Sequence, residues 1–383
     1  KRQSGDNYMD MSAITPSTMQ LNRLKWETTT EYNTGLDASF LKGKLRFTVD
    51  VYQKYIKDLL QKKVKMPTSI GYGNGYEVSY MNSGKMTNKG WEFRVDAVPF
   101  ENRDWRVGFY FNIAHNENKI TEMPDNYTEE NYTFNNGEYA YRREEGRPMG
   151  SFYGYRYKGV CQNKDATYAR DADGNVMKDI SGNAIVMRNG TATIAPGDAL
   201  YEDINHDGVI NQYDIVYLGN SNPRFTGGAG VNVSYKQFKL SAIFYGRYGQ
   251  DVVNSTRLNN ESMRGIDNQS TAVLRRWRNE GDQTDIPRAL YGEGYNTLGS
   301  DRFVEDASYL RLKSLSFNYR LPKKIIQRWG FSNIDVYVTG YNLFTWTKYT
   351  GQDPEVKTEN TYARDSATTP ASIQLVAGFN LSF

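Results

Sequence analysis

The chain has 383 residues, of which 47 are Lys or Arg and 44 are Asp or Glu, so its net charge is only +3. This near balance argues against nucleic acid as a partner, and the single cysteine excludes an intrachain disulfide. No apolar run reaches the ~18 residues of a transmembrane helix, but a β-barrel, in which only alternate strand residues meet lipid, is compatible with the 30 Tyr and 34 Gly.

Apolar and polar residues alternate in many segments of the chain, which predicts strands with one apolar and one polar face. One such segment turns Leu45, Phe47 and Val49 to the same side. In chain order the pattern predicts nine strands, at residues 33–40, 44–60, 90–99, 105–120, 225–235, 238–249, 307–319, 333–347 and 373–383. The alternation slips at Lys313 and Ser314, which predicts a β-bulge at that point.

The connections between these strands are of two kinds, and the two kinds mostly alternate. Short turns are expected at 41–43, 101–104 and 236–237, and long polar segments at roughly 61–89, 121–149, 250–306 and 348–372. A barrel threaded through a membrane sorts its connections in this way, with tight periplasmic turns and long outer loops. The stretch 150–159 fits only if it pairs with another extra strand, near 198–203, or if it lies outside the membrane.

The last strand alternates to the final residue of the chain, with Phe379, Leu381 and Phe383 on its apolar side. About ten residues is the length that a tilted strand needs to cross the hydrocarbon layer. Taken alone, this strand would fit a soluble sandwich equally well. Together with the sorted loops it predicts an all-β fold, an antiparallel up-and-down transmembrane barrel, in which Phe379, Leu381 and Phe383 form the C-terminal signal for barrel closure.

A sheet of about nine to eleven strands would have two free edges, and unpaired backbone groups cannot face lipid. We therefore expect the chain to be the C-terminal part of a barrel, with partner strands N-terminal to Lys1 or in a companion chain. No signal peptide is visible at Lys1, and the chain opens in polar sequence. Both features favour a piece of a longer protein.

A long loop insert is expected at 161–224, and residues 203–214 within it have the spacing of a calcium loop. Positions one, three, five and twelve carry side-chain oxygens, position six is Gly, position seven offers a carbonyl and position nine can bind through water. The expected ligands are Asp203, Asn205, Asp207, the Val209 carbonyl, Asn211 and Asp214. A turn rich in Asp, Asn and Gly that holds no metal is the alternative, because position twelve is not Glu and no helix precedes the loop. We expect a structural Ca²⁺ site.

Short motifs occur along most of the chain, at 24–27, 35–37, 50–52, 57–60, 88–92, 145–155, 197–198, 203–208, 218–225, 309–312 and 341–344. The strongest is Leu-Gly-Asn-Ser-Asn-Pro-Arg-Phe at 218–225. Together and in this order, these motifs resemble the C-terminal half of the SusC/RagA family of TonB-dependent outer-membrane transporters of the Bacteroidetes.

The resemblance implies a barrel of about 22 strands in the bacterial outer membrane, with a plug domain and a signal peptide that are absent from this chain. It also implies a SusD-like surface lipoprotein as a lid, and energy from TonB, ExbB and ExbD. The expected function is the active import of oligosaccharides or oligopeptides across the outer membrane. A soluble, secreted, β-rich glycan-binding module with a calcium loop is the alternative.

Aromatic residues gather in one of the long loops and could contact a sugar ring, a peptide side chain or the lid, or could simply pack loop against loop. They are Tyr127, Tyr132, Phe134, Tyr139 and Tyr141. The chain has only two histidines and no plausible Ser/His/Asp set. We therefore expect that the chain has no catalytic residue and that it is not an enzyme.

Overall fold

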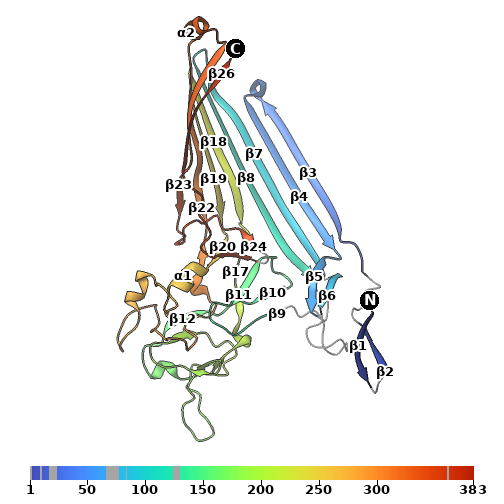
Figure 1. Cartoon of the computed structure of the whole chain (residues 1–383), viewed down its shortest axis with the longest axis vertical. Coiled ribbons are helices and arrows are strands. Elements are labelled where there is room, and N and C mark those ends of the chain that lie inside the picture. Colours follow the sequence, from blue (N-terminus) through green and yellow to red (C-terminus); the bar gives the residue numbers. More distant parts are fainter. Residues whose placement is uncertain are drawn as a thin grey trace.

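A sheet of nine antiparallel strands dominates the computed structural model, which describes residues 2–8, 11–16, 24–65, 77–82, 84–123, 130–359 and 362–383. The spatial order of the strands is β26-β23-β22-β19-β18-β8-β7-β4-β3, and this sheet is the tall wall in Figure 1. Its strands are β3 (Thr28–Phe40), β4 (Leu45–Lys57), β7 (Lys85–Glu101), β8 (Trp105–Glu122), β18 (Phe225–Tyr235), β19 (Phe238–Tyr248), β22 (Tyr309–Arg320), β23 (Asn333–Thr347) and β26 (Gln374–Ser382). All nine strands predicted from the sequence are confirmed.

The strands follow one another in space as they do in the chain once the shorter strands of the loops are set aside, so the sheet is an up-and-down meander. The predicted bulge is also confirmed. The pairing of β22 with β19 skips Lys313, and its pairing with β23 shifts register at the same place. Within the described part of the chain, β3 and β26 have a sheet neighbour on one side only, so this sheet does not close on itself.

The pairing register sorts the side chains onto two faces. One row across the sheet runs from Leu36 through Val49, Phe93, Ile113, Gly227, Gly246 and Leu310 to Trp346, and the next row, on the other face, runs from Asp37 through Thr48, Arg94, Asn112, Gly228, Tyr245 and Arg311 to Thr345. Side chains of the apolar face are not packed in a protein interior, since Phe109 is 39% and Leu375 75% exposed. A whole face of exposed apolar side chains requires an apolar surrounding.

Short and long connections lie at opposite ends of the sheet (Figure 1). The short ones are a 3-10 turn at Leu41–Gly43, residues 102–104, residues 236–237, and a pair of turns formed by α2 (Lys323–Ile326) and the 3-10 helix Gln327–Trp329. The long ones span 58–84, 123–224, 249–308 and 348–373. The predicted sorting of the connections is thus confirmed. No helix in the described ranges is long and apolar enough to cross a membrane.

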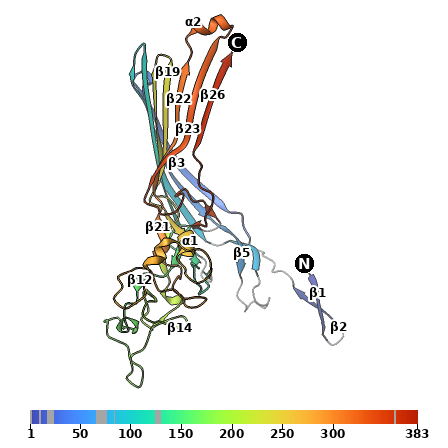
Figure 2. The same ribbon diagram turned by 60° about the vertical axis from the view of Figure 1, so that its left-hand side comes forward.

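The described parts of the connections 123–224, 249–308 and 348–373 fold together at their end of the sheet (Figure 2). Their small sheets are β10-β9, β11-β17, β12-β15, β14-β13-β16 and β21-β20-β25-β24, with separate hairpins β5-β6 and β1-β2. The bounds are β1 (Arg2–Tyr8), β2 (Met11–Pro16), β5 (Leu60–Lys65), β6 (Glu77–Asn82), β9 (Glu130–Asn131), β10 (Tyr141–Arg142), β11 (Ser151–Gly154), β12 (Tyr157–Val160), β13 (Arg188–Asn189), β14 (Ala192–Thr193), β15 (Ala199–Tyr201), β16 (Val209–Ile210), β17 (Val216–Asn220), β20 (Asp251–Asn254), β21 (Val304–Asp306), β24 (Thr358–Glu359) and β25 (Tyr362–Asp365).

The helices of these loops are short. They are α1 (Ser255–Asn260) and the 3-10 helices Asp165–Thr167, Gln212–Asp214, Thr271–Arg275 and Asp301–Phe303. The stretch 150–159 takes part in β11 and β12, which pair with β17 and β15, outside the nine-stranded sheet. The expected extra strand near 198–203 therefore exists as β15, but the pair belongs to the loops and not to the barrel wall.

The loops share an apolar core of their own, so they form one packed assembly and not a set of independent loops. Phe152, Tyr153 and Leu298 are fully buried in it. One cluster joins residues from 140 to 298, and a second joins residues from 139 to 362. Segments more than 150 residues apart thus fix one another above the end of the barrel wall.

Candidate functional site

The polar face of the nine-stranded sheet is a wall of charged and hydroxyl side chains. Near the short turns a hollow of 860 Å³ lies among residues that include Arg46, Arg94, Asp96, Arg106 and Tyr110. Arg94 forms two hydrogen bonds to Asp96, of 2.7 and 2.8 Å, and its guanidinium lies 5.4 Å from the ring centre of Tyr110. Such a wall suits a water-filled lumen, as the interior of an outer-membrane barrel does.

Tyrosines of this polar face lie flat over glycines of the neighbouring strand. The directly paired residues are Tyr52 with Gly90, Tyr110 with Gly230 and Tyr337 with Gly378. A Cβ atom added at any of these glycines would overlap the ring of its tyrosine. The aromatic rings therefore use space that only glycine leaves free, which is a cross-strand packing unit of the sheet.

A buried ion network joins the loop 348–373 to the wall. Arg311 of β22 donates to Asp353 over 2.5 Å, to Glu355 over 2.8 Å and to the Thr345 hydroxyl over 2.9 Å, and its side chain is only 3% exposed. Lys313, the bulge residue, reaches Glu355 over 3.2 Å. The bulge thus brings a second cation to the same carboxylate.

Ionisation of Asp353 is favoured in this network. Burial works against the charged form, but hydrogen bonds from the N–H groups of Ala371 and Glu355 and from Arg311 together hold the pKa of Asp353 below its ordinary value. Asp353 therefore stays a carboxylate at neutral pH and holds the loop to Arg311.

A second hollow, of 740 Å³, lies between this loop and the wall, at the loop end of the polar face. Arg247 of β19 and Arg364 of β25 both line it. Arg247 donates to the Tyr245 hydroxyl and Arg364 to the Ser255 hydroxyl, and no ion pair joins either one to a carboxylate within the described ranges. Two guanidinium groups thus remain able to pair with an acidic ligand.

The expected calcium loop closes on itself through hydrogen bonds. Asp203 accepts from the N–H of Asp207 (3.2 Å) and of Gly208 (2.7 Å), and Asp207 accepts from Val209 N–H (2.8 Å). Asp214 is buried, and its two oxygens accept from the N–H groups of Ile204 and Asn211, at 2.8 Å each. Asn211 caps the short 3-10 helix that follows.

The donor set of this loop is compatible with a hard cation. An ionised carboxylate has about four lone-pair sites, so one backbone hydrogen bond per oxygen leaves room for a metal. Burial raises the pKa of Asp214, the N–H groups of Asn211 and Ile204 offset part of this shift, and the Asp203 carboxylate adds to it. In the ranges that the structure describes, no three His, Cys, Asp or Glu side chains are grouped to hold a metal. A cation bound here would therefore also need the Asn205 and Asn211 amides and the Val209 carbonyl.

The loop aromatics that were candidates for ligand or lid contact mostly pack inside the loops. The Tyr139 side chain is 6% exposed and donates to the Ser300 carbonyl over 2.7 Å. Phe134 packs edge-on against Tyr295, and the hydroxyl of Tyr132 meets that of Tyr155. Tyr141 is half-buried and accepts from Arg143, and Tyr127 lies outside the described residues. The contacts favour loop-to-loop packing for Tyr132, Phe134 and Tyr139, while ligand or lid contact stays a prediction.

Two further polar clusters of the loops were not expected from the sequence. Arg288 forms a two-point ion pair with Asp198, which also accepts from Asn296. Glu261 is paired on both sides, by Arg257 and by the buried Arg302. The only sequence signal was the motif at 197–198. Its glycine has a φ of 90° and lies against the Trp277 ring, where a Cβ would collide.

Comparisons with known proteins agree with this architecture. Residues 2–343 match the family model described as TonB dependent receptor-like, beta-barrel. TonB-dependent receptor P3 of Formosa agariphila is 32% identical over 349 residues, which cover 88% of this chain and 32% of that protein. TonB-dependent receptor SusC of Bacteroides thetaiotaomicron is 27% identical over 389 residues, which cover 99% of this chain and 34% of that protein.

A solved structure of the RagAB peptide transporter has the same fold. It matches with a TM-score of 0.71 and 26% identity, over 100% of this chain and 38% of that chain. The chain thus spans about a third of the length of the curated relatives that it matches. None of these matches supports the alternative of a soluble glycan-binding module.

The matched family consists of non-enzymatic transporters, which confirms that this chain is not an enzyme. The fold, with its apolar outer face and polar inner face, is that of the family's barrel. The chain therefore belongs to the TonB-dependent receptor family of outer-membrane β-barrel proteins, in the group that contains SusC and RagA.

Proposed function

We propose that this chain forms part of the wall and outer loops of an active importer of oligosaccharides or oligopeptides. The observation that carries the proposal is the two-faced sheet, apolar on one side and lined by charged hollows on the other, with a packed loop assembly at one end only. A solute too large for an open pore would bind at the loop end and pass along the polar face. No covalent chemistry is required of the residues described here.

The remaining parts of the transporter would come from outside this chain. We propose that further barrel strands and an N-terminal plug complete a barrel of about 22 strands, that a SusD-like lipoprotein covers the loops as a lid, and that TonB, ExbB and ExbD supply energy. The similarity to SusC and RagAB supports a SusD-like partner and dependence on TonB, and the description of RagAB as a peptide transporter supports the oligopeptide class. The oligosaccharide class rests on the sequence motifs alone.

The test is uptake by cells that carry the full-length transporter with its lipoprotein partner. Cargo that co-purifies with the complex is identified by mass spectrometry, and growth on that cargo as sole nutrient is then measured with and without TonB. We expect an oligosaccharide or oligopeptide that supports growth only when TonB is present. TonB-independent growth, or a complex that carries no such cargo, would refute active import.

We also propose that residues 203–214 bind a structural Ca²⁺, with Asp203, Asn205, Asp207, Asn211, Asp214 and the Val209 carbonyl as ligands. The self-closed loop and the buried Asp214 carboxylate support it. When bound, the cation would neutralise the facing carboxylates of Asp203 and Asp214. In Asp207→Ala the calcium-dependent rise in thermal stability should vanish, whereas Asp179→Ala, in a turn with the same side-chain-to-backbone hydrogen bonds, should keep it. If calcium does not raise the thermal stability of the unchanged protein, residues 203–214 hold no calcium site.

For the last strand, we propose that Phe379, Leu381 and Phe383 act as the signal for barrel assembly. Phe379 and Leu381 are exposed on the apolar side of β26, and Phe383 follows this strand, is exposed, and has its ring 5.2 Å from that of Phe331. Removing Phe383 should lower the amount of assembled transporter in the outer membrane, measured by heat-modifiable migration on gels. Normal assembly of this variant would exclude the signal.

A further inference from the structure

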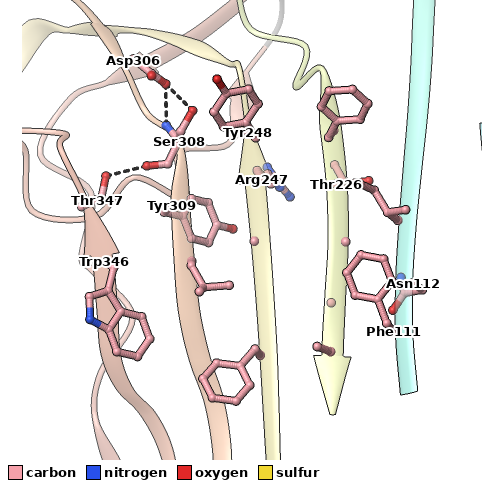
Figure 3. A pocket seen from close by; sticks show the side chains of 18 of the residues that line it. Phe111, Asn112, Thr226, Arg247, Tyr248, Asp306, Ser308, Tyr309, Trp346 and Thr347 are labelled. Atoms are coloured by element: carbon pink, nitrogen blue, oxygen red, sulfur yellow. Dashed lines mark hydrogen bonds between the residues drawn. The ribbon is translucent and has the colours of Figure 1, made fainter. Parts of the chain in front are cut away.

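A hollow of 680 Å³ opens on the apolar face of the wall, at the loop end of β18, β19, β22 and β23 (Figure 3). Its volume lies within the ~300–1,000 Å³ of small-molecule sites. Two glycines of the same cross-sheet row, Gly227 and Gly246, leave the gap between Ile113 and Leu310. A Cβ at Gly227 would lie 2.5 Å from the Asn112 carbonyl, and one at Gly246 would lie 2.7 Å from the Tyr309 carbonyl. The gap is therefore fixed by the backbone.

The hollow lies at the level of the outer leaflet. β19 has 11 residues from Phe238 to Tyr248, and ten steps of ~3.3 Å tilted by ~40° span about 25 Å, the height of the apolar band of an outer-membrane barrel. Phe238 stacks on Tyr319 at the short-turn end, and Tyr248 stacks on Phe225 at the loop end. These aromatic pairs mark the two interfaces, and the hollow borders the outer one.

The walls of the hollow are apolar and aromatic. Phe111, Phe244, Leu310 and Trp346 line it from four different strands, and Trp346 lies 6.4 Å from Phe244, ring to ring. All four belong to the apolar face of the sheet. These walls offer an extended apolar chain a surface of contact. The polar residues Asn112 and Thr226 also line the hollow, but the pairing register places their side chains on the opposite face of the sheet.

The rim of the hollow toward the loops is polar, and a lysine lies on it. Ser308 donates to Asp306, and Thr347 donates to the Ser308 carbonyl over 2.8 Å (Figure 3). Lys348 also lines the hollow, is exposed, and forms no ion pair with a carboxylate in the part of the chain that the structure describes. A lysine at this level meets the headgroups of the outer leaflet, where it attracts negative charge.

We propose that this hollow is a lipid-binding site that holds one acyl chain of an anionic lipid of the outer leaflet, with Lys348 paired to the headgroup. The site has the two parts that such a lipid needs, an apolar slot inside the hydrocarbon layer and a cation directly above it. Binding here would fix a lipid to the barrel wall beneath the junction of β22 and β23 with the outer loops.

The test uses the full transporter with its partner chains, extracted from outer membranes in mild detergent, and counts retained lipids by native mass spectrometry. Ala229 lies in the hollow between Phe111 and Phe244, so Ala229→Phe places a bulky ring inside it. Ala242 lies on the same face of β19, two residues further from the loops than Phe244, and outside the hollow. Ala242→Phe is therefore the matched control. We expect Ala229→Phe to lose one retained lipid per barrel and Ala242→Phe to keep it.

Lys348 provides a second test that does not disturb the wall, because its side chain is exposed. Lys348→Glu should reduce retention of the anionic lipid at least several-fold, and Lys348→Arg should preserve it. Equal lipid counts in Ala229→Phe and Ala242→Phe would overturn the proposal, as would a retained lipid without charge. Loss of self-association in Ala229→Phe with an unchanged lipid count would also overturn it, because the hollow would then be a contact between two copies.

Discussion

Pairs of one tyrosine with one glycine of the neighbouring strand explain the role of some of the many tyrosines, which the sequence alone did not reveal. A high count of tyrosines, here 30, suits a membrane interface or a sugar-binding surface, but some of these tyrosines fill space over glycines on the polar face of the sheet. Tyr110 over Gly230 and Tyr52 over Gly90 belong to this group. The pairing could not be foreseen, since it depends on register between strands that are far apart in the chain.

Gly230→Ala should therefore destabilise the barrel, because the added methyl group overlaps the Tyr110 ring and overpacking costs about 1–3 kcal/mol. Gly108, on the same face, is the control. A Cβ there would lie 3.9 Å from the nearest atom, so Gly108→Ala should be neutral or stabilising by up to ~1 kcal/mol. Urea unfolding of the full-length protein in detergent measures both. Equal effects of the two changes would contradict the role of the ring.

The pKa of Asp353 predicts a pH dependence. Since this pKa is lowered on folding, the carboxylate contributes stability above its unfolded value of about 4, and the contribution is lost as pH falls through the lower folded pKa. Asp353→Asn should thus be less stable than the unchanged protein at pH 5–8, and the difference should shrink below pH ~4. Thermal unfolding across this pH range checks it. A difference that stays constant down to pH ~3 would contradict the lowered pKa.

At the scale of elements, the loop 348–373 depends on one arginine of the wall. Arg311 is buried and pairs with two partly exposed carboxylates of that loop, and removing one partner of a buried pair costs up to about 3–5 kcal/mol. Arg311→Gln should release the loop and raise its rate of cleavage by added protease by at least tenfold. Arg320→Gln is the control on the same strand. Its pair with Asp335 is exposed on the arginine side and is worth only about 0–1 kcal/mol. Protection of the loop in Arg311→Gln would show that the apolar core alone holds it.

The strands of the wall could be predicted from the sequence, whereas most of the short strands of the loops could not, for one physical reason. Lipid on one side and water on the other impose a period of two on long strands, and even the bulge at Lys313 is visible as a slip of that period. Other strands of the loop assembly, such as β13 and β14, have only two residues each. Nothing in so short a segment distinguishes a strand from a turn.

The candidate sites follow the same division. The calcium loop is a local pattern of 12 consecutive residues, so its candidates could be named from spacing. The pair of Asp198 and Arg288 joins residues 90 positions apart and has no periodic signal. Tyr139 shows why residue type is not enough, because an aromatic ring serves equally well in a binding surface and in the core where it lies.

At the scale of the whole molecule, the barrel architecture requires that the apolar face of the sheet meets lipid and that the polar face meets water. Two adjacent residues of the central strand β18 separate the faces: Val231 is exposed on the apolar face, and Asn232 accepts a 2.8 Å hydrogen bond from Ser241 on the polar face. An arginine in the hydrocarbon layer of a barrel costs about 2–4 kcal/mol near the midplane. The same residue in a water-filled lumen costs little beyond a hydrogen bond of about 1 kcal/mol.

Val231→Arg should therefore lower the folding free energy of the full-length barrel in lipid vesicles by about 2–4 kcal/mol, and Asn232→Arg by about 1 kcal/mol or less. Tryptophan fluorescence during denaturant unfolding from vesicles measures both, and the fraction assembled in cells should follow the same order. The neighbouring positions share strand, depth and substituent, so the difference between them reports only the surrounding medium. If Asn232→Arg were the more damaging change, the apolar face would be packed against protein and the polar face would not line a lumen.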